Sequence, residues 1–326
     1  MAAQKSERNR TLSLSGEERV RLQSLLRSPR SPLSAEEIVN RVFAGDLFEI
    51  APLLPERSAD LLILDPPYNL AKNFNGLKFA RMEDGAYQEY IERCLKILLR
   101  VLKPEASVYL CGDWRCSAAL YAAAGKFLTV RNRISWQREK GRGSLRNWKN
   151  CTEDIWFATV GKEYYFDPEA VKVRRKVIAP YKQGGVPRDW EETGEGNFRM
   201  TCASNFWDDI TIPFWSMPEN TGHPTQKPEK LIAKLILASC PEGGLVLDPF
   251  LGSGTSAVVA AKLGRSYCGI ELNDEYCCWA LKRLETAREL PRIQGYADGV
   301  FWERNSDPER RRIRKNLRSR KKNADA

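Results

Sequence analysis

The chain has 326 residues and a net charge of +10, so it can bury one large α/β core together with an inserted module. No apolar run approaches the ~18 residues of a membrane span, and no apolar segment follows the basic N-terminus as in a secretory signal. The basic excess favours a polyanionic partner, and nine cysteines without regular spacing are typical of reduced thiols in a cytoplasm.

Residues 1–36 are polar and basic with Ser-Pro repeats, and they predict a flexible extension. Arg41 to Ala44 then predicts the first strand, which leads to Gly45 and Asp46. The core of the fold is therefore expected to begin near residue 37.

The tetrapeptide Asp65-Pro66-Pro67-Tyr68 directly follows the apolar run 61–64, which predicts a buried parallel strand that opens into a rigid loop. The prolines fix φ and lack amide donors, so the loop presents carbonyl oxygens beside a carboxylate and a ring. Such a site suits a planar molecule with an exocyclic amino group, because Asp65 and a proline carbonyl accept its hydrogen bonds while Tyr68 stacks on it. An ordinary strand-to-loop turn uses the same residue types and is the alternative.

The next elements alternate in type. Residues 87–102 predict a helix, 107–111 a strand and 117–124 a second helix, whereas 131–215 is irregular and aromatic with long loops. At the start of that region, glycines interrupt a basic segment, which predicts two strands joined by a flexible basic loop. Contact with a polyanion and simple solvation are the two interpretations of that loop.

A second motif begins with the predicted strand 245–248 and continues as Pro249-Phe250-Leu251-Gly252-Ser253-Gly254-Thr255-Ser256 before a helix over 257–263. Its glycines let the backbone approach a ligand closely. The strand 266–270 follows and ends in Glu271, where an acidic residue is placed to bind ribose hydroxyls. The spacings of phosphate-binding glycine motifs are missing, so a phosphate ligand is not favoured.

Together these motifs resemble the permuted β group of DNA amino-methyltransferases, which modify adenine N6 or cytosine N4 with S-adenosylmethionine. In that group D-P-P-Y comes first, the target-recognition region follows and an F-x-G-x-G cofactor loop comes last, which is the order found here. A third signature of the family, His223-Pro224-Thr225-Gln226-Lys227-Pro228, lies between them. The resemblance covers roughly residues 42–284.

The resemblance implies an α/β fold, a Rossmann-like doubly wound methyltransferase sheet in circularly permuted motif order with an inserted target-recognition region. The expected divisions are a flexible basic extension (1–36), a catalytic half (37–130), a target-recognition and DNA-contact region (131–215), a cofactor-binding half (216–290) and a basic tail (291–326).

Direct in-line methyl transfer to a base flipped out of the duplex is implied, without a metal or a covalent intermediate. The expected catalytic residues are Asp65, Pro66, Pro67 and Tyr68. The expected cofactor-binding residues are Asp46, Asp65, His223, Thr225, Gln226, Lys227, Asp248, Phe250, Gly252, Ser253, Gly254, Thr255 and Glu271, with packing as an equal alternative for His223. The expected DNA contacts are Asn69, Arg138, Lys140, Arg142, Arg146 and Lys149.

Adenine in double-stranded DNA is the expected target, because D-P-P-Y is more typical of adenine-N6 enzymes than of cytosine-N4 enzymes. Cytosine N4, single-stranded DNA and RNA are alternatives. A catalytically silent DNA-binding protein is an alternative of another class, disfavoured by the intact Asp65 and the intact glycine loop. A homodimer and a cognate restriction endonuclease are left open, and the expected location is the cytoplasm, at the nucleoid, with a bacterial or phage origin.

Overall fold

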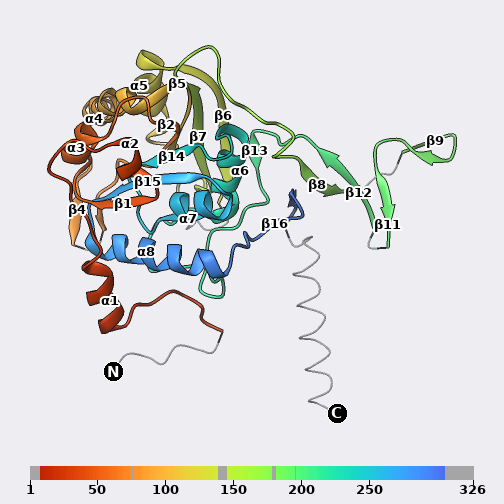
Figure 1. The fold of residues 1–326 in the computed structure, drawn as a ribbon. Helices are drawn as coiled ribbons and strands as arrows, with labels where there is room; N and C mark the ends of the chain where they lie inside the picture. Colours follow the sequence, from red (N-terminus) through yellow and green to blue (C-terminus); the bar gives the residue numbers. More distant parts are fainter. Residues whose placement is uncertain (1–7, 75, 139–144, 178–180, 195, 305–326) are drawn as a thin grey trace.

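An eight-stranded mixed sheet forms the centre of the computed structural model, which describes residues 8–74, 76–138, 145–177, 181–194 and 196–304 (Figure 1). Its order is β1-β15-β14-β2-β5-β7-β6-β13. The first five strands are parallel to one another, whereas β7 runs antiparallel to both of its neighbours. In sheet order the strands are Arg41–Ala44, Ser266–Glu271, Leu245–Asp248, Ala59–Leu64, Leu102–Asp113, Thr152–Thr159, Thr129–Gln137 and Phe206–Trp207.

Helices cover both faces of this sheet (Figure 1). Strand β2 alternates between two cores, because Leu61 and Ile63 pack on one face while Leu62 and Leu64 pack on the other. One face is covered by α2 (Ala35–Ile38), α3 (Leu47–Ile50), α4 (Asp84–Leu98) and α5 (Ser117–Phe127). The other is covered by α6 (Glu229–Ser239), α7 (Thr255–Lys262) and α8 (Asp274–Glu289). The doubly wound α/β fold is thereby confirmed.

The helix expected over 87–102 differs at its end. It spans Asp84–Leu98 and continues as the 3-10 turn Leu99–Val101, and a second such turn covers Ala51–Leu53. Leu102 already belongs to β5, where it pairs with Ala59 of β2. Tertiary strand pairing therefore ends the helix before Pro104.

A second, five-stranded sheet extends beside the main one as an arm with the order β11-β12-β8-β17-β16 (Figure 1). In that order its strands are Glu191–Thr193, Gly196–Thr201, Val173–Lys176, Val300–Trp302 and Tyr296–Ala297. Two further pairs of strands form separate two-stranded sheets, one from β9 (Lys182–Gln183) and β10 (Val186–Pro187) and one from β3 (Lys72–Phe74) and β4 (Leu77–Phe79). The region expected to be irregular from residue 131 onward begins inside β6 and contains β7. Both are strands of the main sheet, so this part of the region is regular. The prediction of a basic tail from residue 291 is also wrong up to residue 304, because this segment contributes strands to the arm, where Phe301 pairs with Val173.

The N-terminal segment is not the flexible extension that its composition indicates, at least over the described residues 8–36. Helix α1 (Gly16–Gln23) packs on α8, and its Leu22 is completely buried. Ser15 and Glu18 form a reciprocal capping box, which is the local signal that predicts this helix. Further toward the N-terminus, the amide of Leu12 donates to the carbonyl of Asn220 at 2.8 Å, so the segment also holds the loop before α6.

The nine cysteines are free thiols, and seven of them are buried as small side chains of the core. Within the described ranges there is no group of three or more His, Cys, Asp or Glu side chains that could hold a metal ion. Nor does any helix there have the length and apolar character needed to cross a membrane.

Replacing Leu22 with alanine tests the packing of the N-terminal segment. We expect the free energy of unfolding to fall by about 2–5 kcal/mol, because a fully buried leucine leaves a cavity. Leu25→Ala is the matched control, since Leu25 is 52% exposed and its removal should change stability by less than about 0.5 kcal/mol. Equal denaturant midpoints for the two variants would contradict the packing of this segment.

Candidate active site

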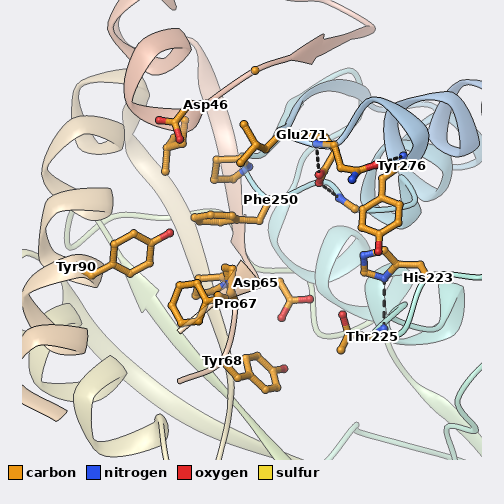
Figure 2. Close-up of a pocket in the computed structure, with 18 of the residues that line it drawn as sticks. Asp46, Asp65, Pro67, Tyr68, Tyr90, His223, Thr225, Phe250, Glu271 and Tyr276 are labelled. Atoms are coloured by element: carbon orange, nitrogen blue, oxygen red, sulfur yellow. Dashed lines mark hydrogen bonds between the residues drawn. The ribbon is translucent and has the colours of Figure 1, made fainter. Parts of the chain in front are cut away.

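A cavity of about 330 Å³ opens at the carboxyl ends of β2 and β14, which are neighbours in the sheet. Open α/β sheets bind ligands at such a switch point, and the volume falls in the range of small-molecule sites. Figure 2 shows the labelled side chains facing the cavity from several separate elements. Those that line it include Asp46, Phe48, Asp65, Pro66, Pro67, Tyr68, Tyr90, His223, Thr225, Phe250, Gly252, Glu271 and Tyr276.

Asp65 follows β2 and forms a salt bridge with Lys227, which precedes α6. The Lys227 Nζ lies 2.8 Å from Oδ1 and 2.6 Å from Oδ2 of Asp65. Burial raises the pKa of Asp65 above its usual range, while the Lys227 ammonium acts in the opposite direction. Burial acts to lower the pKa of Lys227, but Asp65 and Glu153 outweigh it and raise that pKa. Lys227 therefore stays an ammonium beside the expected catalytic carboxylate.

Tyr68 is fixed through its hydroxyl. The hydroxyl donates to Glu153 Oε2 at 2.9 Å and accepts a hydrogen bond from Lys227 Nζ at 3.1 Å. Burial raises the pKa of Tyr68 well above its usual value, and the carboxylates of Asp65 and Glu153 raise it further. The side chain therefore remains a neutral phenol whose ring lines the cavity.

The two prolines of the loop differ in their carbonyl partners. The Pro67 carbonyl accepts a hydrogen bond from the Tyr87 hydroxyl at 3.1 Å. Among the described residues no donor contacts the Pro66 carbonyl, so it can accept a bond from a ligand. Asn69, expected to contact DNA, is instead buried and exchanges two hydrogen bonds with the backbone of Met82, at 2.7 and 2.8 Å. It fixes the end of the loop.

Gly252 connects the glycine loop to Glu271 at the end of β15. Its amide donates to Glu271 Oε2 at 2.7 Å, and Oε1 of the same carboxylate accepts from the Asn273 amide at 2.8 Å. Gly252 has φ +55°, and a Cβ there would lie only 3.1 Å from His223 Nε2, so both conformation and space favour glycine. Burial raises the pKa of Glu271. The Glu271 carboxylate still has acceptor capacity toward the cavity.

The end of the cavity between α3 and α4 is aromatic. Asp46 caps α3 by accepting the Phe48 amide at 2.7 Å. The rings of Phe48 and Tyr90 meet edge to face, with centroids 6.2 Å apart. This end suits a planar ring system with a polar edge.

Several expected cofactor residues lie behind the cavity wall. Asp248 accepts hydrogen bonds from the Ser256 hydroxyl and the Phe250 amide. The Thr255 hydroxyl donates to the Lys227 carbonyl at 3.1 Å, and the Gln226 side chain bonds to residues 219 and 221. The described residues from the expected set that shape the loops without lining the cavity are Gln226, Lys227, Asp248, Ser253, Gly254 and Thr255.

The expected DNA contacts other than Asn69 belong to the connection from β6 to β7. Arg138 donates to the buried Glu153, and its own side chain is half-buried, with 30% of it exposed. Arg146 and Lys149 are exposed, whereas Lys140 and Arg142 lie outside the described residues.

Sequence patterns missed Glu153, Tyr90 and Tyr276. Glu153 lies on β7, and its carboxylate reaches Tyr68 because β7 pairs with β5 beside the catalytic loop. Tyr90 and Tyr276 occupy helices α4 and α8, where aromatic residues ordinarily indicate core packing. Their positions facing the cavity depend on strand order, which no local motif contains.

Comparison with known proteins finds similarity to DNA methyltransferases in both sequence and structure. The family described as DNA methylase matches residues 59–282. The chain is 32% identical to DNA adenine methyltransferase YhdJ of Escherichia coli (strain K12) over 81% of this chain and 90% of that protein. It is 31% identical to the type II methyltransferase M.HpaI of Haemophilus parainfluenzae, over 76% of this chain and 74% of that protein. The structure of PvuII DNA methyltransferase (cytosine-N4-specific) has the same fold, with TM-score 0.59 and 16% identity over 81% of this chain and 94% of that one.

Asp248→Asn tests whether this residue supports the loop or binds the expected cofactor. Burial raises the pKa of Asp248 to about 7, so the folded protein holds the proton more tightly than the unfolded chain. The contribution of Asp248 to the wild-type free energy of unfolding should therefore fall as pH rises from about 4 to 7, by about 4 kcal/mol in total, and asparagine should remove this pH dependence. We expect S-adenosylmethionine to bind the variant within about twofold of wild type.

Equilibrium dialysis and urea unfolding across this pH range provide the two measurements. A loss of cofactor affinity of tenfold or more in a folded variant would assign Asp248 to cofactor binding and contradict the supporting role.

Proposed function

Because the chain belongs to the DNA methylase family, we propose that it transfers a methyl group from S-adenosylmethionine to the N6 amino group of adenine in double-stranded DNA. The observation that carries this proposal is that Asp65 and Glu271 face one cavity at the switch point of the sheet. One carboxylate suits an amino group and the other suits ribose hydroxyls, so donor and acceptor of the methyl group would meet between them.

The residues around the cavity fit this cofactor. Asp46, Asp65 and Glu271 all line it, and no lysine or arginine is among the described lining residues, so a cation is favoured over a phosphate chain. We assign ribose binding to Glu271, the methionine end to His223 and Thr225, and the adenine end to the aromatic side near Asp46. When bound, S-adenosylmethionine supplies an electrophilic methyl group on its sulfonium.

The catalytic loop would activate the target amine. An exocyclic amine is a weak nucleophile because its lone pair conjugates with the base. Asp65 and the Pro66 carbonyl would accept its two N–H groups, favouring a tetrahedral nitrogen and stabilising the positive charge that develops there. The nitrogen lone pair would form the new N–C bond while the S–C electron pair is left on the sulfur of the methyl donor, and the nitrogen would then lose one proton to water or Asp65. Tyr68 would stack on the base.

Adenine is favoured over cytosine by the relatives' names and by the motif. The E. coli relative is named an adenine methyltransferase, whereas the cytosine-N4-specific structure shares 16% identity and supports the fold alone. Asp65 also provides the carboxylate of the D-P-P-Y motif, the form that is more typical of adenine-N6 enzymes than of cytosine-N4 enzymes.

The target base would have to leave the duplex, at a cost of a few kcal/mol. Phosphate contacts can offset that cost, and the exposed Arg146 and Lys149 lie in the connection between β6 and β7. Trp148 between them is 93% exposed and offers a stacking surface. We propose that this connection binds DNA.

Asp65→Asn tests the assignment of the reaction and the catalytic loop together. We expect transfer from labelled S-adenosylmethionine to unmethylated bacterial DNA to yield N6-methyladenine, and the variant to be slower by a factor on the order of 10²–10³. The exposed Asp298, on the turn between β16 and β17, provides the matched control Asp298→Asn, which should retain the wild-type rate.

Separation of the labelled nucleosides distinguishes the outcomes. Label in N4-methylcytosine would contradict the choice of base. Cofactor binding without transfer to duplex or single-stranded DNA would contradict the proposed reaction and favour the non-catalytic alternative or an RNA target.

A further inference from the structure

Four charged side chains form a continuous network beneath the catalytic loop. Lys227 contacts Asp65 at 2.6 Å and Glu153 Oε2 at 3.5 Å, while Arg138 binds the other oxygen of Glu153. Glu153 is only 4% exposed and Lys227 only 7%. The network joins β6, β7, the loop after β2 and the loop before α6.

The proposed reaction uses Asp65 and Tyr68 but gives Glu153 no role. Glu153 does not line the cavity, and it lies outside the three sequence motifs. A buried ion pair is weak evidence for stability, because desolvation offsets much of its attraction. Yet Glu153 accepts a hydrogen bond from the hydroxyl of Tyr68 and contacts the Lys227 ammonium that binds Asp65, so it touches one catalytic side chain directly and the partner of the other.

The charges in this network balance. Asp65 and Glu153 carry two negative charges, and Lys227 and Arg138 carry two positive ones. Without Glu153 the network would have a net charge of +1 next to a nitrogen that becomes positive during methyl transfer. Glu153 also shares the Lys227 ammonium with Asp65. Because part of the positive charge of Lys227 is then offset by Glu153, Asp65 is a stronger acceptor for the substrate amine.

We propose that Glu153 is a positioning residue for methyl transfer, which orients the Tyr68 ring and balances Lys227 so that Asp65 can accept the target amine. This inference rests on the proposed function. Arg138, directly after β6, pairs with Glu153, so its positive charge offsets the negative charge of Glu153.

Glu153→Gln keeps the size of the side chain and an oxygen that can accept the Tyr68 hydroxyl, but removes the charge. We expect the single-turnover rate at saturating DNA and cofactor to fall about ten- to a hundredfold, with the dissociation constant of S-adenosylmethionine changed less than about twofold. Glu105→Gln is the matched control, because Glu105 is exposed at the opposite end of β5 and should leave the rate unchanged.

A charge-balance test separates this role from simple packing. Arg138→Gln added to Glu153→Gln restores a neutral network of Asp65 and Lys227, so the double variant should be faster than Glu153→Gln alone. Arg138→Gln alone shows what the loss of the arginine does by itself. A double variant no faster than Glu153→Gln would overturn the electrostatic role.

The acid side of the pH–rate profile provides a further readout. The Glu153 charge raises the pKa of Asp65, so Glu153→Gln should move the acid limb to lower pH if Asp65 must be ionised. The other titratable groups around Asp65 are Lys227, Tyr68, Tyr87, Cys111 and Asp248, and all of them are retained in the variant.

Glu153→Asp is the second variant, which keeps the charge but shortens the side chain. An acid limb near that of wild type and an intermediate rate are expected. If wild type methylates DNA while Glu153→Gln has the wild-type rate and acid limb, the inference is wrong and the proposed function stands. If wild type transfers no methyl group to DNA, the proposed function itself has failed.

Discussion

The salt bridge between Lys227 and Asp65 is the contact on which the site depends. It joins two residues 162 positions apart in sequence, one directly after β2 and one two residues before α6. Lys227 also accepts the Thr255 hydroxyl at its backbone carbonyl, so the same residue ties the glycine loop to the catalytic loop. A buried ammonium is stable only with such partners. Lys227 thereby connects three segments, which are the Asp-Pro-Pro-Tyr loop, the glycine loop and its own loop before α6.

The sheet provides the frame for this contact. Strands β2 and β14 are neighbours, with helices leaving them toward opposite faces, so their loops diverge and leave a cavity between them. Gly252 can approach His223 closely because it has no Cβ, and its amide orients Glu271 toward the same space. The charge of the cavity follows from this arrangement. Asp46, Asp65 and Glu271 line the cavity, whereas Lys227 and Arg138 do not line it and contact Asp65 and Glu153.

The sequence predicts the parts of this account that are local. Strand β1 has the expected bounds, and Asp65, Phe250 and Glu271 line one cavity because each lies at the end of a parallel strand or within two residues after it. Other features depend on contacts between distant elements. Glu153 reaches Tyr68 only because β7 pairs with β5. Lys227 does not line the cavity, because its ammonium is held by Asp65 and by Glu153, which lies behind the wall. The composition of the N-terminal segment predicts flexibility, because the order of α1 depends on its packing against α8, which lies far along the chain.

The most direct test of the central claim is a crystal structure of the chain with bound S-adenosylmethionine. The account predicts that the ribose hydroxyls lie within hydrogen-bonding distance of Glu271 and that the methyl group points toward the space beside Asp65 and the Pro66 carbonyl. A cofactor bound elsewhere, or one in this cavity whose methyl group points away from Asp65, would contradict the claim that the two loops form a single methyl-transfer site.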